Sequence, residues 1–237
     1  MPAGVRRIAT WHMGRPIKAR WLDGVVLISE WQKSLLPPKS KLAHCVVNNW
    51  VSHFPPPDSA RLTALRQELD IGERDFVAGF VGRPSPYKGV RESVEAFRLW
   101  AKEDAHFLVV GGTVEGVQFH EKTGNPNIHA MGYRTDVRDI YSLLDCMVAP
   151  SYAEPFGLVV IEAMRAGCRV IVRDTCGLHD IAAANADVIA VPTSDPAEIL
   201  EALKRAYALR DTPPSYDMSP YEKADRVADI EAFYRTL

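Results

Sequence analysis

The sequence from residue 148 to residue 167, VAPSYAEPFGLVVIEAMRAG, most constrains how this chain can fold. It predicts the end of a buried strand, a loop containing proline and polar residues, and a helix that opens after Phe156-Gly157 and ends at Gly167. The first amides of a helix lack intrahelical partners, and the helix dipole is positive at that end. The pattern therefore predicts a binding place for an anionic group, above all a phosphate, at Gly157 and Leu158.

Two carboxylates bracket this predicted turn. Glu154 lies in the loop and Glu162 lies in the helix, with seven residues between them. Because Glu162 comes four residues after Leu158, its side chain is expected to lean back toward the end of the helix where Glu154 also lies. Each carboxylate alone is more often structural, since a glutamate in the first turns offsets the helix dipole and Glu-Pro is common in exposed loops.

The segment as a whole favours a functional role for both glutamates. The segment EPFGLVVIEAMRAG resembles the E-x7-E signature of retaining glycosyltransferases of the GT-B fold, in particular glycosyltransferase family 4. The resemblance implies that Glu162 binds the ribose of a nucleotide diphosphate sugar. The groups that it assigns to the sugar hydroxyls and the phosphate are Glu154 and the backbone of Phe156, Gly157 and Leu158.

A second glycine turn follows the apolar run FVAGFV and reads GRPSPYKG, from Gly82 to Gly89. An arginine can bond two oxygens of a diphosphate and a lysine supplies a point charge, although such a turn alone is more often a solvated basic loop. The turn is similar to the GR-x4-KG segment of family 4, which implies that Arg83 and Lys88 clasp the donor pyrophosphate. The following helix is expected to bury a face formed by Val90, Val94, Phe97 and Ala101.

Three further residues are candidates through the resemblance. His12 ends a strand predicted in residues 5–12, where family members place a histidine on the donor sugar; a structural histidine at a strand end is weighed equally. Tyr133 and Arg134 follow Gly132 in a loop that the family sets against the nucleotide base. No Asp-x-Asp metal motif is present, and the resemblance implies that cations and a helix N-terminus stabilise the leaving diphosphate without a divalent metal.

Alternating apolar strands and helices predict an α/β fold with a doubly wound, mainly parallel, Rossmann-like sheet. The resemblance makes residues 58–212 the C-terminal nucleotide-sugar-binding domain of a GT-B protein. Residues 1–54 are similar to the end of the N-terminal acceptor domain, so that domain is expected to be incomplete. A stiff proline linker separates the two, and residues 213–237 are expected to return to the N-terminal part as a helix.

Two turns depart from the family pattern. Asn48-Asn49 stands where Asn-Gly is usual, which questions the conformation of the hinge because asparagine tolerates positive φ less well than glycine. Cys176 replaces a glycine, and Asp180 stands where the family has a glutamate.

Composition limits the partners. A net charge of −2 argues against nucleic acid, and the four cysteines lack a C-x-x-C pair and are expected as thiols in a reducing compartment, with Cys146 and Cys168 buried. No apolar run is long enough to span a bilayer, and no signal-peptide pattern is present. We therefore expect a cytoplasmic protein, which a membrane-bound acceptor would bring to the inner surface.

The expected function is transfer of a hexosyl-type sugar from a UDP- or GDP-sugar to a glycan or lipid-linked acceptor, with retention implied by the family alone. The nucleotide sugar is a co-substrate, and no resident cofactor is expected. One alternative is a non-catalytic half that needs a partner chain to supply the missing domain. Another is a glycoside hydrolase using Glu154 and Glu162, which leaves Arg83 and Lys88 without a role. A nucleotide-sugar epimerase of GT-B architecture is a third alternative and is less favoured, because E-x7-E is more typical of transferases.

Overall fold

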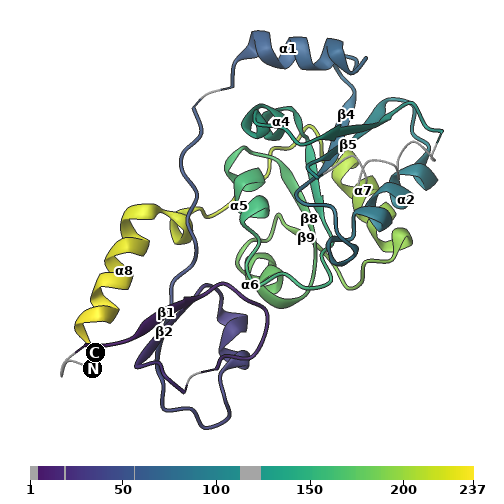
Figure 1. The fold of residues 1–237 in the computed structure, drawn as a ribbon. Coiled ribbons are helices and arrows are strands. Elements are labelled where there is room, and N and C mark those ends of the chain that lie inside the picture. Colours follow the sequence, from purple (N-terminus) through teal and green to yellow (C-terminus); the bar gives the residue numbers. More distant parts are fainter. Residues whose placement is uncertain (1–4, 19, 56, 113–123) are drawn as a thin grey trace.

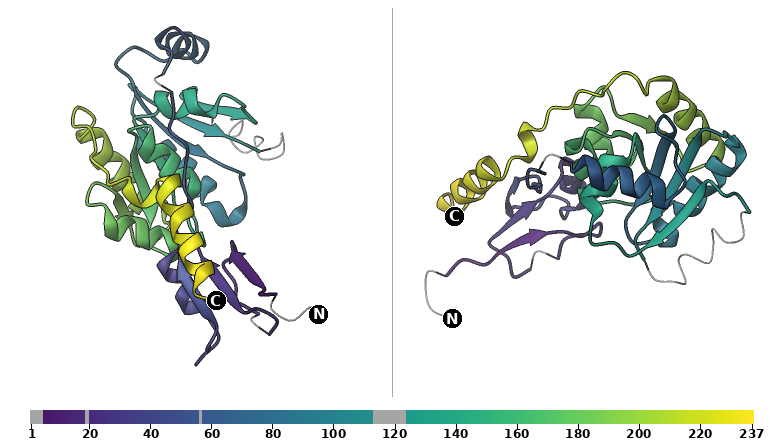
Figure 2. Two further views of the ribbon diagram at one scale, coloured as in Figure 1. Left: turned by 90° about the vertical axis from the view of Figure 1, so that its left-hand side faces the viewer. Right: turned by 90° about the horizontal axis from the view of Figure 1, so that it is seen from above.

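The chain forms two parallel β-sheets, each with its own helices (Figure 1). The structure is a computed structural model, and it describes residues 5–18, 20–55, 57–112 and 124–237. The smaller sheet has three strands in the order β1-β2-β3, and the larger has six in the order β6-β5-β4-β7-β8-β9. The two sheets lie in separate parts of the molecule and are joined by two extended segments (Figures 1 and 2).

The small sheet is built from the first strands of the chain. Its elements are β1 (Ile8–Trp11), β2 (Gly24–Leu27), β3 (Ala43–Val46) and the 3-10 helix η1 (Glu30–Leu35). The side chain of Gln32 fixes η1, because its Oε1 accepts from the Ile28 amide at 2.7 Å. The C-terminal helix α8 (Lys223–Arg235) lies along this sheet, where its Phe233 packs with Val26.

The large sheet confirms the predicted doubly wound, parallel arrangement. Its strands are β4 (Phe76–Val81), β5 (Ala105–Val110), β6 (Ile128–Gly132), β7 (Cys146–Ala149), β8 (Arg169–Arg173) and β9 (Ile189–Val191). Every neighbouring pair is parallel. The central strands are buried on both faces, which explains why they are continuous apolar runs rather than alternating ones.

Helices cover both faces of the large sheet. One face carries α2 (Val90–Trp100) and α7 (Pro196–Ala208), whose apolar side chains join one buried cluster. The other carries α1 (Ser59–Glu68), α4 (Val137–Leu143), α5 (Leu158–Arg165) and α6 (Cys176–Ala184), with side chains in a second cluster. Figure 1 shows the two groups on opposite sides of the strands.

Local signals set several helix ends. At the start of α7, the Asp195 side chain accepts from the Ala197 amide at 2.8 Å, and Pro196 occupies the first turn. The prediction that Ala101 belongs to the buried face of α2 was wrong. The helix ends at Trp100, and Ala101 is an exposed residue with a φ of 47°.

Two segments connect the sheets. The first contains the predicted proline linker, of which Pro56 lies outside the described residues, and the second leads from α7 through η3 (Ser219–Tyr221) to α8. Glu222 in the second segment accepts from Arg165 at 2.7 Å and pairs with His53 of the first at 3.1 Å. This contact ties both segments to the end of α5.

Candidate functional site

Two loops meet at the carboxyl ends of the neighbouring strands β4 and β7. The β4 loop comprises residues 82–89, including the short 3-10 helix η2 (Pro86–Lys88), and the β7 loop comprises residues 150–157. Gly89 has a φ of 69° and lies so near the β7 loop that an added Cβ would be 2.6 Å from the Pro150 carbonyl oxygen. Glycine therefore lets the two predicted motifs touch through their backbones.

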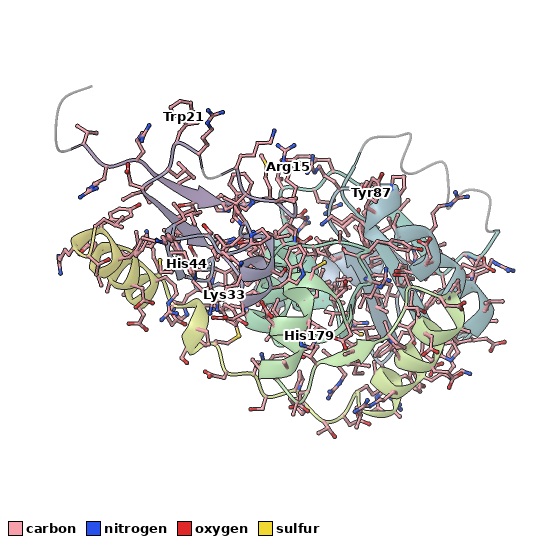
Figure 3. All side chains as sticks on the ribbon, turned by 90° about the horizontal axis from the view of Figure 1, so that it is seen from below. Arg15, Trp21, Lys33, His44, Tyr87 and His179 are labelled. Carbon is pink, nitrogen blue, oxygen red and sulfur yellow. The ribbon has the colours of Figure 1, made fainter. Side chains whose placement is uncertain are left out.

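An ion pair joins the two loops. The Nζ of Lys88 donates to Oε2 of Glu154, and these side chains are 31% and 16% exposed. The Tyr152 amide adds a bond of 2.8 Å to the Tyr87 carbonyl, while the Tyr87 side chain itself is 71% exposed (Figure 3). Arg83, in the same β4 loop, is exposed. Because an ammonium group has three donors, Lys88 can keep Glu154 and still bond an anionic ligand.

The start of α5 has the geometry expected of an anion-binding helix. Gly157 has a φ of 109°, and an added Cβ there would lie 2.7 Å from Cδ2 of Leu178. Among the described residues, the first α5 amide that bonds back to this turn is that of Val160, at 2.9 Å from the Gly157 carbonyl. The amides before it are left for a ligand at the positive end of the helix dipole.

The start of α6 packs against the backbone of the β7 loop. The Gly177 amide donates to the Glu154 carbonyl at 2.9 Å, and an added Cβ at Gly177 would lie 2.2 Å from the Pro155 carbonyl oxygen. Cys176 has a φ of 52°, so this cysteine keeps the left-handed backbone that suits the glycine it replaces.

A cleft of about 320 Å³ opens between these loops and the first part of the chain. Its lining includes His12, Ile28, Asn49, Gly82, Arg83, Lys88, Glu154, Phe156, Gly157 and Leu158. The structure thus brings together all the residues predicted for the site except Tyr133, Arg134 and Glu162. Neither Asn48 nor Asn49 has a positive φ, so the expected difficulty at that turn does not arise.

Contacts from the first part of the chain hold this cleft together. Oδ2 of Asp180 in α6 accepts from the Trp31 amide at 2.9 Å, at the start of η1. A Cβ added to Gly14 would lie 3.5 Å from Cγ of Pro155 and 3.6 Å from Cη2 of Trp31. The loop that carries His12 is therefore seated beside the β7 loop.

Glu162 does not share the cleft of Glu154, contrary to the expectation of a common mouth. It lines an adjoining hollow of about 690 Å³, and Leu158 lines both spaces. Oε2 of Glu162 accepts from the Tyr141 hydroxyl at 2.9 Å. Burial raises the pKa of Glu162, while this hydrogen bond and the positive charge of Arg138 act in the opposite direction.

Sequence reasoning missed three residues of this second hollow. Tyr141 and Arg138 come from α4, and Phe54 comes from the linker. The Phe54 ring stacks on the Tyr141 ring with centroids 6.3 Å apart. The Arg138 guanidinium lies 5.3 Å from the centroid of the Phe54 ring. Only the position of Arg138, shortly after the predicted base loop, offered a sequence signal.

The predicted base loop is at the rim of the structure. The Tyr133 side chain is 79% exposed. Arg134 makes two hydrogen bonds to Asp136, of 2.8 and 2.5 Å, and lies 3.6 Å from Glu68. Arg134 and Arg61 hold the pKa of Asp136 well below its usual range. The Arg134 guanidinium is thus held by carboxylates, and the Tyr133 ring is left exposed.

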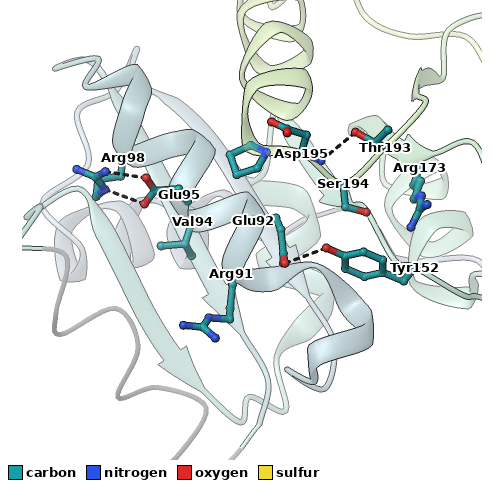
Figure 4. Close-up of a pocket in the computed structure, with 11 residues that line it drawn as sticks. Arg91, Glu92, Val94, Glu95, Arg98, Tyr152, Arg173, Thr193, Ser194 and Asp195 are labelled. Carbon is teal, nitrogen blue, oxygen red and sulfur yellow. Dashed lines mark hydrogen bonds and ion pairs between the residues drawn. The ribbon is translucent and has the colours of Figure 1, made fainter.

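A third hollow, of about 890 Å³, lies between α2 and the start of α7 and contains none of the predicted residues (Figure 4). Several of its polar side chains bond to one another. Arg98 makes bonds of 2.8 and 2.7 Å to Glu95, and the Tyr152 hydroxyl donates to Glu92 at 3.0 Å. Arg173 lies 5.0 Å from the Tyr152 ring centroid. In all, three arginines (Arg91, Arg98 and Arg173) and three carboxylates (Glu92, Glu95 and Asp195) line this hollow.

Within the part of the chain that the structure describes, no three His, Cys, Asp or Glu side chains are arranged to hold a metal ion. None of the described helices has both the length and the apolar character needed to cross a membrane. The four cysteines are free. Cys146 and Cys168 are buried, as predicted, and burial raises the pKa of both thiols.

Known proteins with similar sequences are glycosyltransferases. The lipopolysaccharide glucosyltransferase WaaG of Escherichia coli is 30% identical over 176 residues, which cover 71% of this chain and 46% of that protein. Glycogen synthase 2 of Methylococcus capsulatus is 32% identical over 130 residues, covering 49% of this chain and 26% of that enzyme. The chain thus spans less than half the length of these relatives.

Solved structures show the same fold. Anabaena Alr3699/HepE, in complex with UDP and glucose, superposes with a TM-score of 0.78 and 18% identity over 97% of this chain and 71% of that one. The WaaG structure gives a TM-score of 0.69 and 23% identity over 90% and 63% of the two chains. With the parallel six-stranded sheet, these likenesses confirm the expected GT-B type fold. The sequence pattern of the family matches residues 63–224, and the chain therefore belongs to the glycosyl transferases, group 1.

Proposed function

We propose that this chain is a retaining glycosyltransferase that moves a hexosyl-type sugar from a UDP- or GDP-sugar to a glycan or lipid-linked acceptor. One observation carries the proposal. Two cationic side chains, a carboxylate and the start of a helix surround a single cleft of about 320 Å³. This combination suits a sugar diphosphate, because the cations and the helix favour the phosphates and the carboxylate accepts sugar hydroxyls.

The proposed roles follow the geometry of the cleft. Arg83, Lys88 and the first amides of α5 hold the diphosphate. Glu154 accepts hydrogen bonds from the sugar, and Lys88 keeps that carboxylate in place. His12 contacts the sugar from the opposite side of the cleft. The nucleoside lies over Leu158 in the adjoining hollow, with its ribose on Glu162 and its base against the backbone near Tyr133.

The chemistry needs stabilisation of negative charge. When the bond between the anomeric carbon and the diphosphate breaks, its electron pair leaves on a phosphate oxygen. Arg83, Lys88 and the α5 dipole stand where that charge develops, so they favour the transition state over the bound donor. The proposal assigns no step to a metal ion. Retention is carried over from the resemblance to family 4 alone.

Both the acceptor and the location of the protein belong to the same proposal. Glycan and lipid-linked acceptors are inferred from relatives named as a lipopolysaccharide glucosyltransferase and as a transferase acting on a diphospho-undecaprenol substrate. A lipid-linked acceptor would hold a cytoplasmic protein at the inner membrane surface. A second candidate is a donor-binding half that needs a partner chain for turnover, because the residues with a proposed role in the cleft all serve the donor.

Release of nucleoside diphosphate tests the proposal. The chain is incubated with UDP- and GDP-sugars, with and without a lipid-linked oligosaccharide, in the presence of EDTA. We expect acceptor-dependent release that Arg83→Ala abolishes. The matched control is Arg98→Ala, because Arg98 is an exposed arginine paired with Glu95 away from the cleft. Binding of a nucleotide sugar without release of the nucleoside diphosphate supports the second candidate, the partner-dependent donor-binding half. Glycoside hydrolysis without any nucleotide contradicts both.

A further inference from the structure

Glu162 is held by one neighbour that no sequence motif assigns to the site. The hydroxyl of Tyr141, on α4, is 2.9 Å from Oε2 of Glu162, on α5. Tyr141 is 1% exposed, so its hydroxyl has little access to solvent as an alternative partner. Burial and the neighbouring carboxylate raise the pKa of this phenol, which therefore stays protonated and donates to Glu162.

The Tyr141 ring cannot easily turn away from the carboxylate. Phe54 stacks on one face with an interplanar angle of 12°. The backbone of Tyr141 is fixed as well, because its carbonyl accepts from the Cys168 thiol at 2.9 Å. Phe54 from the linker and Cys168 beside β8 thus hold Tyr141 of α4 so that its hydroxyl points at Oε2 of Glu162.

We propose that Tyr141 is a positioning residue for Glu162: it occupies Oε2 and leaves Oε1 aimed at the ribose hydroxyls of the donor. This inference rests on the proposed ribose-binding role of Glu162. A glutamate side chain has three rotatable bonds, and a carboxylate that already has one fixed partner loses less freedom when a ligand binds. The proposed role of Tyr141, which is 1% exposed, is exerted through Glu162.

The hydrogen bond also favours the charged form of Glu162. The ionisable groups that line the hollow with it are Asp136, Arg138, Asp139 and Tyr141. Burial raises the Glu162 pKa, and the Tyr141 hydrogen bond and Arg138 lower it. Removing the hydroxyl therefore raises the pKa further. Since only the ionised carboxylate accepts from both ribose hydroxyls and Tyr141, nucleotide binding should then fail at a higher pH than in the wild-type chain.

The test compares ribonucleotides with their 2′-deoxy counterparts. Binding of UDP, GDP, 2′-deoxy-UDP and 2′-deoxy-GDP is measured by calorimetry between pH 5 and 8 with Tyr141→Phe, which removes a single oxygen atom. The matched control is Tyr207→Phe, because the Tyr207 hydroxyl donates to the Asp104 carboxylate at 2.6 Å on the far face of the sheet. Glu162→Gln tests the proposed function on the same ligands.

We expect Tyr141→Phe to weaken ribonucleotide binding on the order of tenfold, to weaken deoxynucleotide binding less, and to shift the acid loss of binding to higher pH. Tyr207→Phe should match the wild-type chain. If Tyr141→Phe does not fold, Phe54→Leu, which removes the ring stacked on Tyr141, should reduce the preference for ribose in the same direction.

The outcomes separate the two levels of the argument. If Glu162→Gln binds ribo- and deoxynucleotides as the wild-type chain does, the ribose role of Glu162 fails and this inference fails with it. The other outcome is that Glu162→Gln loses the preference for ribose while Tyr141→Phe keeps both that preference and the wild-type pH dependence of binding. In that case the proposed function stands and Tyr141 is only a structural residue.

Discussion

Gly177→Ala is the substitution that most sharply tests how the site is supported. In most helices this change is favourable by about 1 kcal/mol, because alanine has the higher helix propensity. Gly177 does not have a positive φ, so backbone conformation presents no obstacle. The obstacle is steric: the new Cβ would lie 2.2 Å from the Pro155 carbonyl oxygen and 2.9 Å from Cα of Phe156.

The expected cost follows from these contacts. The obstructing atoms are backbone atoms, which cannot rotate away, so the β7 loop must move. Overpacking of this kind costs about 1–3 kcal/mol, and loss of the bond from Gly177 to the Glu154 carbonyl adds about 1 kcal/mol. After subtraction of the gain in helix propensity, we expect a net loss of about 2 kcal/mol in the free energy of unfolding.

Urea denaturation measures that loss, and calorimetry with UDP and GDP measures its effect on the cleft. Displacement of the Glu154 loop should weaken nucleotide-sugar binding as well as stability. The control is Gly167→Ala, at the far end of α5: Gly167 has a φ of 85° but no atom within 4 Å of an added Cβ, so stability alone should fall. A Gly177→Ala chain as stable as the wild type, with equal affinity, would refute the proposed support of the loop.

Three further changes test separate parts of the structure. Cys176→Gly should raise the free energy of unfolding by about 1 kcal/mol, because it relieves a φ of 52°; an unchanged urea midpoint would contradict this. Asp136→Asn should cost roughly 2 kcal/mol near neutral pH. Because Arg134 depresses the pKa of Asp136 in the folded chain, this difference should shrink below about pH 4, where the carboxylate of the unfolded wild-type chain takes up a proton while the folded one stays charged; a constant difference would exclude the ion pair as its cause. His12→Ala should weaken UDP-glucose binding several-fold more than UDP binding, whereas equal losses would exclude a sugar contact.

The sequence predicted the central strand, turn and helix well because their signals are local. Gly157 needs a positive φ, and the apolar runs on either side have the lengths of a strand and a short helix. Asp195 and Pro196 at the start of α7 are a local signal of the same kind. Where the signal was periodicity alone, as at Ala101, the helical pattern ran past the residue at which the chain turns away.

The surroundings of Glu162 could not be predicted from the sequence. Spacing along a helix says which face a residue shares, and it placed Glu162 with Glu154. The direction of its side chain is set instead by Tyr141 and Phe54, which come from segments far apart in the sequence. The ion pairs of Arg134 are likewise tertiary, since one partner is Glu68 in α1. Such contacts leave no pattern in a single sequence.

The most direct test of the donor cleft is calorimetric titration of the intact chain with UDP, GDP and their glucose and mannose conjugates. The comparison is with a Lys88→Ala, Glu162→Ala double variant, and the control is Lys204→Ala, which removes an exposed lysine of α7 paired with Glu201. The proposed site predicts that the wild-type chain and the control bind one nucleotide and its sugar conjugate, and that the double variant binds neither. Equal binding by all three chains, or no binding by the wild type, would contradict it.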